Sequence, residues 1–428
     1  MSEGRWVVLS LVVFLAISGC SALRTAAQTR PEKSPAERYI DFAIAACDKV
    51  EANIPRLTRV GEVMAQRDLN GGTIGAVSGG HPLADEVTGR AGGMMHMGFG
   101  RSWQKDRSES KMVNDMVMAG FGQQPETRVL DQLRQLKQRG CYVVGFGPGH
   151  ALKPEDLALC DEFFDNGVDD EWLTDLRGGV LIDVLNAWAL TAEHVGALTR
   201  AGKMPPMYIS GLCEEGPAWS DRYLGKMQFH DDVVVPPVAP GELARRYIVA
   251  IRELLVNLRK NELADLRLAS DLISGELAQG RKTLVLHIGH MCPYYVGTGK
   301  DGVWADGSFM YWGDPAAVDR FRKQAQPGAL VFRLGYLGLH RDLASLYSET
   351  GQRVILAMGE NTRPEWQLSD EFRQSLLVEI DMGYKMGDAV VSIEGYPIRV
   401  FPPSGVIQLV TYEAINAEVL SRAPKPEQ

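Results

Sequence analysis

The chain has 428 residues, of which 45% are hydrophobic and 23% charged, and its formal net charge is −9. A chain of this length exceeds what one compact core organises and suits two domains of roughly 200 residues each. No basic stripe with interleaved aromatic residues stands out in the sequence, so we expect no nucleic-acid partner. The acidic balance favours solubility and does not identify a substrate.

Residues 1–20 are predicted to be a targeting segment. Arg5 precedes an apolar run at 6–17, which is too short to span a bilayer comfortably. The run ends in Ser18-Gly19-Cys20, which resembles a bacterial lipobox, so we expect cleavage before Cys20 and lipidation of its thiol. An ordinary signal peptide or a single N-terminal anchor is the alternative. Residues 21–35 then form a flexible tether, and the protein is expected to be exported and anchored to a membrane of the bacterial cell envelope.

The most informative stretch is 71–93, GGTIGAVSGGHPLADEVTGRAGG. It predicts a short strand at 73–77, a glycine turn at 78–81 and then a helix. Glycines allow positive φ, and the free amides at a helix start carry the positive end of its dipole, so this turn could hold an anion. Glu86 and Arg90 are four residues apart and would share one helical face. The alternative is an ordinary strand–turn–helix in which this pair is exposed.

The same stretch resembles the opening motif of the SIS (sugar isomerase) domain, especially the branch that contains sedoheptulose-7-phosphate isomerase. That family has a Gly-Gly strand, a glycine-rich turn and a helix with EELTGR or EE-x-x-x-RAGG. The matching residues here are Gly71-Gly72, the turn at 78–81, and DEVTGRAGG at 85–93. The resemblance implies a three-layer α-β-α sandwich around a parallel sheet, and a sugar or sugar phosphate as ligand.

Further along the first half, 140–145 and 207–210 are predicted as buried strands, and 181–200 as a closing helix. Strands that alternate with helices indicate parallel sheets with right-handed crossovers. Many SIS domains grip phosphate with a Ser/Thr-rich loop after the second strand. The loop that we take as its equivalent, GFGPGH at 145–150, has no hydroxyl and loses one amide at Pro148. An amide nest capped by His150 is the expected substitute, and phosphate binding is in doubt.

An internal repeat divides the chain. Residues 39–81 and 247–290 both begin Tyr-Ile, continue with apolar positions at helical spacing, and end in glycine, a short strand and Gly-His. The proline-rich segment 236–241 separates the copies. We therefore predict domains at 36–240 and 241–428. The fold class is α/β, with two tandem three-layer α-β-α sandwiches around parallel sheets, similar to the isomerase portion of glucosamine-6-phosphate synthase.

The second half has predicted strands at 283–286, 329–333 and 354–358 and a closing helix at 406–421. It lacks Glu-x-x-x-Arg behind His290, so it is expected to be a degenerate copy that pairs with the first domain or closes its site. His287, His290 and Cys292 do not suit a metal site, because residues 287 and 290 of one strand point to opposite faces unless the chain turns between them.

The resemblance also implies roles for single residues. Glu86 falls on the base that moves a proton between C1 and C2 of the open-chain sugar. The family's closing helix carries a glutamine and, eight residues later, a histidine, which can join the glutamate in binding zinc. Asn186 and His194 have this spacing, and His194 would act as the acid or ring-opening group. Pro82 stands where the family has its metal-binding histidine, so no metal or other cofactor is expected, with zinc as the alternative. Without the family, His194 would be a helix-surface histidine and Asn186 an interior hydrogen-bonding residue.

Two functional hypotheses stay open. One is an aldose–ketose isomerase with Glu86 and His194 as catalytic residues. The other is a surface-anchored domain pair that recognises a sugar derivative without turning it over, which export favours because phosphorylated sugars are scarce outside the cytoplasm. A structural lipoprotein is a third possibility, although it explains neither the turn nor the repeat. We predict a carbohydrate-derivative-binding protein, leave catalysis open and consider a homodimer. The expected substrate-binding residues are Ser78, Gly79, Gly80, His81, Arg90, His150 and Asn186.

Overall fold

The computed structural model describes residues 32–99, 109–309, 315–336, 346–360 and 368–423. The predicted signal peptide, the lipidation site Cys20 and most of the predicted tether lie outside these ranges. From residue 35 onward, the described residues form one compact unit. Within the described ranges, no helix combines the length and apolar character needed to cross a membrane.

The first sheet has five parallel strands in the order β2-β1-β3-β4-β5. It follows the long helix α2 (Pro35–Leu69) and is closed by α7 (Gly178–Arg200). The strands are β1 (Ile74–Gly79), β2 (Met97–Phe99), β3 (Met116–Phe121), β4 (Tyr142–Gly147) and β5 (Glu162–Asp165). The shorter helices are α3 (Leu83–Val87), α4 (Thr127–Gln138), α5 (Pro154–Leu157), α6 (Glu171–Asp175) and α8 (Gly216–Tyr223).

The second sheet repeats this topology, with parallel strands in the order β7-β6-β8-β9-β10. Helices α9 (Glu242–Asn257) and α10 (Leu263–Leu277) precede it, and a π-helical turn at Leu258–Glu262 joins them. Helix α15 (Ser404–Arg422) closes this half as α7 closes the first. The strands are β6 (Thr283–His287), β7 (Ala305–Phe309), β8 (Leu330–Leu334), β9 (Arg353–Met358) and β10 (Leu376–Asp381). The shorter helices are α11 (Cys292–Tyr295), α12 (Pro315–Gln324) and α14 (Asp370–Ser375). Two separate parallel sheets confirm the predicted fold class and agree with the repeat.

Each sheet is buried on both faces, as β3 illustrates. Met116 and Met118 point into the core that contains the long helices, whereas Val117, Ala119 and Phe121 pack in a second cluster beneath α4. Alternate residues of one strand thus face two different layers. Parallel strands covered on both sides are continuously apolar for this reason.

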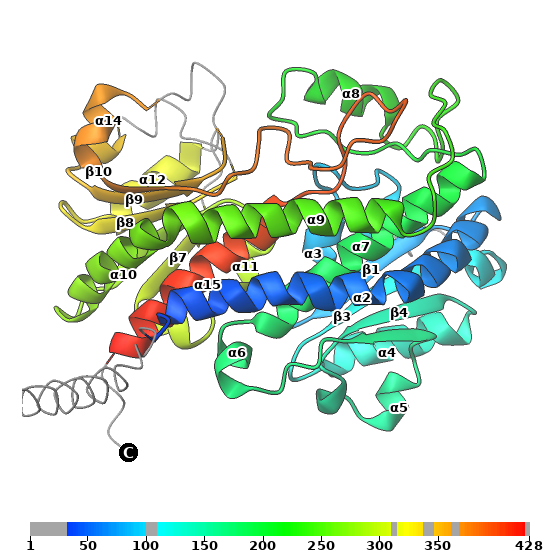
Figure 1. The fold of residues 1–428 in the computed structure, drawn as a ribbon, viewed down its shortest axis with the longest axis horizontal. Coiled ribbons are helices and arrows are strands. Elements are labelled where there is room, and N and C mark those ends of the chain that lie inside the picture. Colours follow the sequence, from blue (N-terminus) through cyan, green and yellow to red (C-terminus); the bar gives the residue numbers. More distant parts are fainter. Residues whose placement is uncertain (1–31, 100–108, 310–314, 337–345, 361–367, 424–428) are drawn as a thin grey trace, which may run out of the picture. The chain divides into compact units, whose positions relative to one another are not determined.

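The long helices of the two halves share one core. Helix α2 packs against α7, α9 and α15, and Figure 1 shows α2 and α9 side by side. Buried residues of this core come from both halves, among them Val60, Leu185, Leu243 and Val410. The boundary predicted at residue 240 lies between α7 and α9 in the chain and stays a prediction.

Two local predictions are wrong. Residues 207–210 do not form a strand, because only Met207 makes a bridge, antiparallel, to Met94. The helix after the glycine turn is only α3, which ends at Val87. Gly89 then takes φ +62°, so Arg90 lies beyond the helix. Strand β3, which the sequence analysis did not identify, occupies the sheet position next to β1.

Candidate functional site

The first-half cavity, of about 510 Å³, opens where the strands of the first sheet end. Its walls come from the segments that follow β1, β3, β4 and β5, and from the start of α7. The strand order reverses at β1 and β3, and open parallel sheets place ligands at such a switch point. The lining residues that matter below are Gly80, His81, Phe121, Gln123, Gln124, Glu126, Asn166, Arg177, Gly179, Asp183, Tyr294 and Tyr295.

A buried polar triad stands in this cavity. His81 is 1% exposed; its Nδ1 accepts a hydrogen bond from the Leu83 amide at 3.1 Å, and its Nε2 lies 3.2 Å from Asp183 Oδ2. This pattern fits an imidazole whose Nε2–H donates to the carboxylate. Asn166 Nδ2 donates to the same oxygen at 2.8 Å. Asp183 Oδ1 has no hydrogen-bond partner in the described part of the chain, and burial raises the pKa of this carboxyl.

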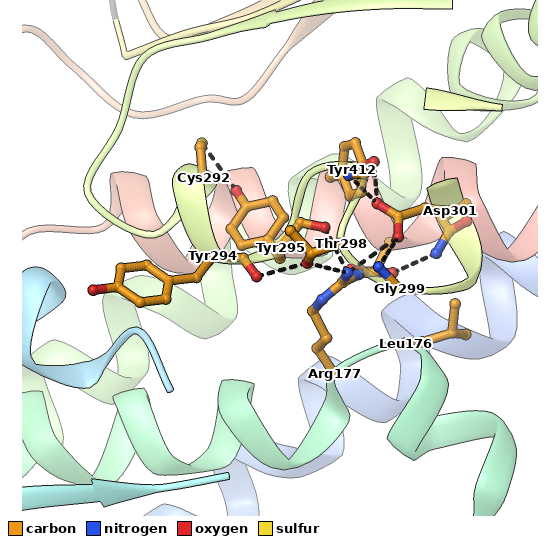
Figure 2. A network of polar contacts seen from close by, with 12 residues as sticks. Leu176, Arg177, Cys292, Tyr294, Tyr295, Thr298, Gly299, Asp301 and Tyr412 are labelled. Carbon is orange, nitrogen blue, oxygen red and sulfur yellow. Dashed lines mark hydrogen bonds and ion pairs between the residues drawn. The ribbon is translucent and has the colours of Figure 1, made fainter. Parts of the chain in front are cut away.

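Arg177 joins the cavity to the second half of the chain, as Figure 2 shows. It has left-handed backbone (φ 54°, ψ 31°) just before α7. Its Nη1 pairs with Glu413, and its Nη2 donates to Asp301 Oδ1 at 3.1 Å and to the Tyr295 carbonyl at 2.5 Å. Although burial alone would lower it, these two carboxylates raise the pKa of Arg177. The network fixes the segment whose residues Tyr294 and Tyr295 form one wall of the cavity.

The predicted glycine turn lies where the sequence indicated. Gly80 takes φ +62° and lines the cavity together with His81. Gly79 approaches α4 closely, because a Cβ there would come within 2.7 Å of Val129 and 2.8 Å of Glu126. Ser78 Oγ accepts from the Ala84 amide at 3.4 Å. The structure thus brings Gly80 and His81 to the cavity, whereas Ser78 and Gly79 shape the turn behind it.

Glu86 and Arg90 form a buried pair between the halves. Glu86 is fully buried; its Oε2 lies 2.5 Å from Arg90 Nη1, and Trp188 Nε1 donates to its Oε1 at 3.0 Å. Burial raises the pKa of Glu86, while Arg90 and Trp188 act in the opposite direction. Arg90 Nη2 also reaches Asp388 at 2.7 Å and Ser404 Oγ at 2.6 Å, both in the second half. The alternative of an exposed surface pair is therefore wrong.

His194 belongs to a different network. It is fully buried, and its Nε2 lies 3.0 Å from Oδ2 of Asp68, which also contacts His96 Nε2 at 3.2 Å. Burial would raise the pKa of Asp68, but hydrogen bonds from the two histidines lower it overall. Asp68 ends α2 just before β1 begins, whereas Glu86 follows the carboxyl end of β1. The two predicted catalytic residues share no partner, so the structure does not bring them together. A surface position for His194 is also wrong.

Asn186 and His150 do not reach the cavity. Asn186 is 1% exposed; its Nδ2 donates to the Ile182 carbonyl at 3.1 Å, and its Oδ1 accepts from Asn53 at 3.2 Å, which matches the interior hydrogen-bonding alternative. His150 is exposed after β4. The expected amide nest is already occupied, because Asp165 Oδ1 accepts from the amides of Gly149 and Gly167 at 2.9 and 2.8 Å.

The repeat also produces a second-half cavity of about 630 Å³, where β6 and β8 end. Its own half supplies the segment Ile288–His290 and Tyr336, and the first half supplies Asp85, Arg90 and Tyr208. The His290 Nδ1 lies 3.0 Å from the Asp85 carbonyl, and the Tyr294 hydroxyl donates to the Asp85 carboxylate. Within the described residues, no group of three or more His, Cys, Asp or Glu side chains is placed to hold a metal ion.

Sequence reasoning missed several residues of the first-half cavity. Asp183 is the only charged residue between Arg177 and Glu193, and this single charge in an apolar helix was a usable signal. Asn166 directly follows β5, and Gln123 follows β3; neither strand had been identified. Tyr294 and Tyr295 come from the other half of the chain, and no local pattern indicates that they reach this cavity.

The chain matches no protein-family model, and no curated protein matches it in sequence. It does resemble solved structures. A candidate phosphosugar isomerase from Clostridium difficile 630 aligns with a TM-score of 0.51 at 8% identity, over 91% of this chain and 93% of that one. A candidate phosphosugar isomerase from Silicibacter pomeroyi DSS-3 aligns with a TM-score of 0.48 at 12% identity, over 91% and 98%. The C-terminal domain of glucosamine-fructose-6-phosphate aminotransferase from Francisella tularensis aligns with a TM-score of 0.40 at 12% identity, over 87% and 96%. The two repeated sheets and the alignment with the Clostridium difficile structure show that the chain has the fold of tandem SIS-like domains.

Proposed function

We propose that the protein binds a carbohydrate derivative in the first-half cavity. The observation that carries this proposal is Asp183, a buried carboxylate that lines the cavity. Its Oδ1 has no partner among the residues that the structure describes, while His81 and Asn166 hold Oδ2. A buried acceptor without a partner is costly, and a ligand hydroxyl would satisfy it. The volume of about 510 Å³ lies in the usual range of small-molecule sites.

The rest of the lining suits the two kinds of surface that a sugar presents. The rings of Phe121, Tyr294 and Tyr295 offer apolar contact to the C–H face of a sugar ring. The amides of Gln123 and Asn166 can donate to ring and hydroxyl oxygens and accept from hydroxyl groups. The lining thus combines aromatic surfaces with polar side chains that can orient a small ligand.

The proposal is for binding rather than isomerisation. Glu86, the predicted base, is fully buried, pairs with Arg90 and lines neither cavity. A general base must come within hydrogen-bond reach of the proton that it removes, and Glu86 has no such access in this geometry.

Calorimetric titration of the purified protein with a panel of sugars and sugar phosphates tests the proposal. Asp183→Asn keeps the shape of the side chain and should weaken binding by at least about tenfold, since it removes a charged acceptor. Asp131→Asn is the matched control, because Asp131 lies on the exposed face of α4, and it should bind like the parent. The proposal fails if no sugar gives a saturable signal, or if Asp183→Asn binds as tightly as the control.

We also propose that the protein is exported and lipid-anchored through Cys20. The apolar run at 6–17 and the sequence Ser18-Gly19-Cys20 support this. Phosphorylated sugars are scarce outside the cytoplasm, so export makes a phosphorylated ligand less expected. A surface-anchored protein that senses a sugar is the form of the function that agrees with both proposals.

A further inference from the structure

We propose that the ligand of the first-half cavity is an unphosphorylated carbohydrate, one rich in hydroxyl groups or bearing an amino group. This inference rests on the proposed function and specifies its substrate class. The inference follows from how few positive charges and hydrogen-bond donors the described part of the cavity wall can offer to an anion.

Among the lining residues that the structure describes, the only Lys or Arg side chain is Arg177, and its charge is already engaged. Glu413 and Asp301, both fully buried, pair with its two terminal nitrogens. The Tyr295 carbonyl and the Thr298 hydroxyl, at 3.3 Å, accept from Nη2 as well. Figure 2 shows the Arg177 side chain directed toward Thr298 and Asp301. A phosphate would have to compete with two buried carboxylates for one cation, and breaking a buried pair of this kind is strongly unfavourable.

The segment after β3, residues 122–126, carries the wrong groups for phosphate. It reads GQQPE and lies at the switch point of the sheet. It has no hydroxyl, Pro125 has no N–H to donate, and the carboxylate of Glu126 lines the cavity. The Glu126 side chain is 44% exposed and has one cationic neighbour, Arg128, at 3.3 Å. A phosphate in the cavity would meet this carboxylate as a like charge.

The backbone amides that could cradle an anion are also limited. Asp165 already accepts from the amides of Gly149 and Gly167. The start of α7 lines the cavity at Gly179, and the dipole of this helix favours negative charge there. Asn166 packs closely on this start, since a Cβ at Gly179 would lie 2.8 Å from its Nδ2. The carboxylate of Asp183, on the same helix, supplies negative charge from the protein itself.

What the cavity does offer is an excess of acceptors. Asp183 Oδ1, the Glu126 carboxylate and the side-chain oxygens of Gln123 and Gln124 can each accept from a ligand hydroxyl or ammonium group. The proton on His81 Nε2 is directed to Asp183 and is not free for a ligand oxygen. A polyol or an amino sugar provides donors for these acceptors, whereas a phosphate provides further acceptors.

The test compares each sugar with its own phosphate. The full-length protein, in detergent, is titrated calorimetrically with glucose, fructose and glucosamine and with the 6-phosphate of each. At least one unphosphorylated sugar should bind about tenfold or more tightly than its 6-phosphate. Glu126→Gln should narrow this preference by roughly fivefold, because it removes a like charge that opposes the phosphate and a charged acceptor that favours the free sugar. Glu155→Gln, an exposed carboxylate on α5, is the matched control and should leave the preference intact.

The outcomes separate the two proposals. Tighter binding of the 6-phosphates, unaffected by Glu126→Gln, would overturn the inference and leave the proposed carbohydrate binding standing. Absence of binding for both members of every pair would overturn the proposed function and this inference with it. If Glu126→Gln does not fold, the pairwise comparison in the parent protein still decides the question.

Discussion

A fall in pH from about 7.5 to about 4.5 should destabilise the folded protein through His287. This residue ends β6, is 4% exposed, and lies beside β8, where the buried Arg333 occupies the neighbouring register position. Burial of the imidazole, and then the charge of Arg333, lower the pKa of His287 from 6.5 to about 4. Protonation therefore costs more in the folded chain than in the unfolded one.

The direction of the effect follows from the order of the two pKa values. Above pH 6.5 the imidazole is neutral in both states, so its contribution to stability is complete. As the pH falls below 6.5, the unfolded chain takes up a proton while the folded chain does not, until the pH nears 4. Each unit between the two pKa values is worth about 1.4 kcal/mol, so about 2.5 kcal/mol should be lost between about pH 7.5 and about pH 4.5.

Urea unfolding at the two pH values, with the parent protein and with His287→Gln, measures this contribution. Glutamine does not titrate, so the loss of unfolding free energy on acidification should be about 2.5 kcal/mol smaller in the variant. His150→Gln, at an exposed histidine, is the control and should behave like the parent. His290 is present in all three proteins and drops out of the comparison. An identical pH dependence in His287→Gln and the parent would refute the reasoning.

Three further predictions concern the pair between the halves and the anchor. Glu86→Gln should lower the free energy of unfolding by about 3 kcal/mol, because Arg90 loses one of its buried carboxylates; a loss under about 1 kcal/mol in urea unfolding would contradict this. Gly405→Ala should also destabilise, by about 2 kcal/mol or more, since its Cβ would lie 2.4 Å from both Glu86 carboxylate oxygens. Its control is Gly275→Ala in α10, where a Cβ meets nothing within 4 Å. Equal melting temperatures of the two variants would argue against a clash between a Cβ at residue 405 and Glu86. Cys20→Ser should move the protein from the membrane to the soluble fraction without changing its thermal unfolding; a variant that stays with membranes would rule out lipid anchoring.

The elements that the sequence predicted well are those whose burial follows a local pattern. The closing helices, predicted at 181–200 and 406–421, are found at Gly178–Arg200 and Ser404–Arg422, because long apolar helices at the centre of a shared core need no polar face. Strand β1 was found because a glycine turn marks its end. Strand β3 was not, because MVMAGF has neither alternation nor a marked turn before it, as is usual for a strand covered on both faces.

The false strand at 207–210 shows the opposite error. Met207, the buried apolar residue of this segment, makes a single bridge to Met94 and is otherwise held by loops. Tyr396, from the second half, accepts a hydrogen bond from the Met207 amide at 3.0 Å, and Trp219 donates to the Met207 carbonyl at 2.8 Å. A short apolar run predicts burial, and what buries it depends on partners far away in the chain.

The Glu86 motif illustrates the same limit at the level of the site. Glu86 and Arg90 do meet, although Arg90 lies beyond α3 and not on the shared helical face that the spacing of four residues predicted. The spacing could not predict the contacts of Arg90 with Asp388 and Ser404, which lie 298 and 314 residues after it in the chain. These contacts help to turn the pair into a buried network. Local sequence therefore located the contact correctly and left open whether solvent or protein surrounds it.

Those contacts across the halves give the second half a structural role that does not depend on a Glu-x-x-x-Arg motif. The segment after β6 supplies Tyr294 and Tyr295 to the first-half cavity, and the segment after β1 supplies Asp85 and Arg90 to the second-half cavity. Each cavity is thus lined by residues of both halves. This role does not require acid–base residues in the second half, because closing a cavity requires aromatic side chains held in place, and the pairing of Arg177 with Asp301 and Glu413 holds them. Selection on the second half is therefore expected to act on the residues that reach the first half rather than on a catalytic motif of its own.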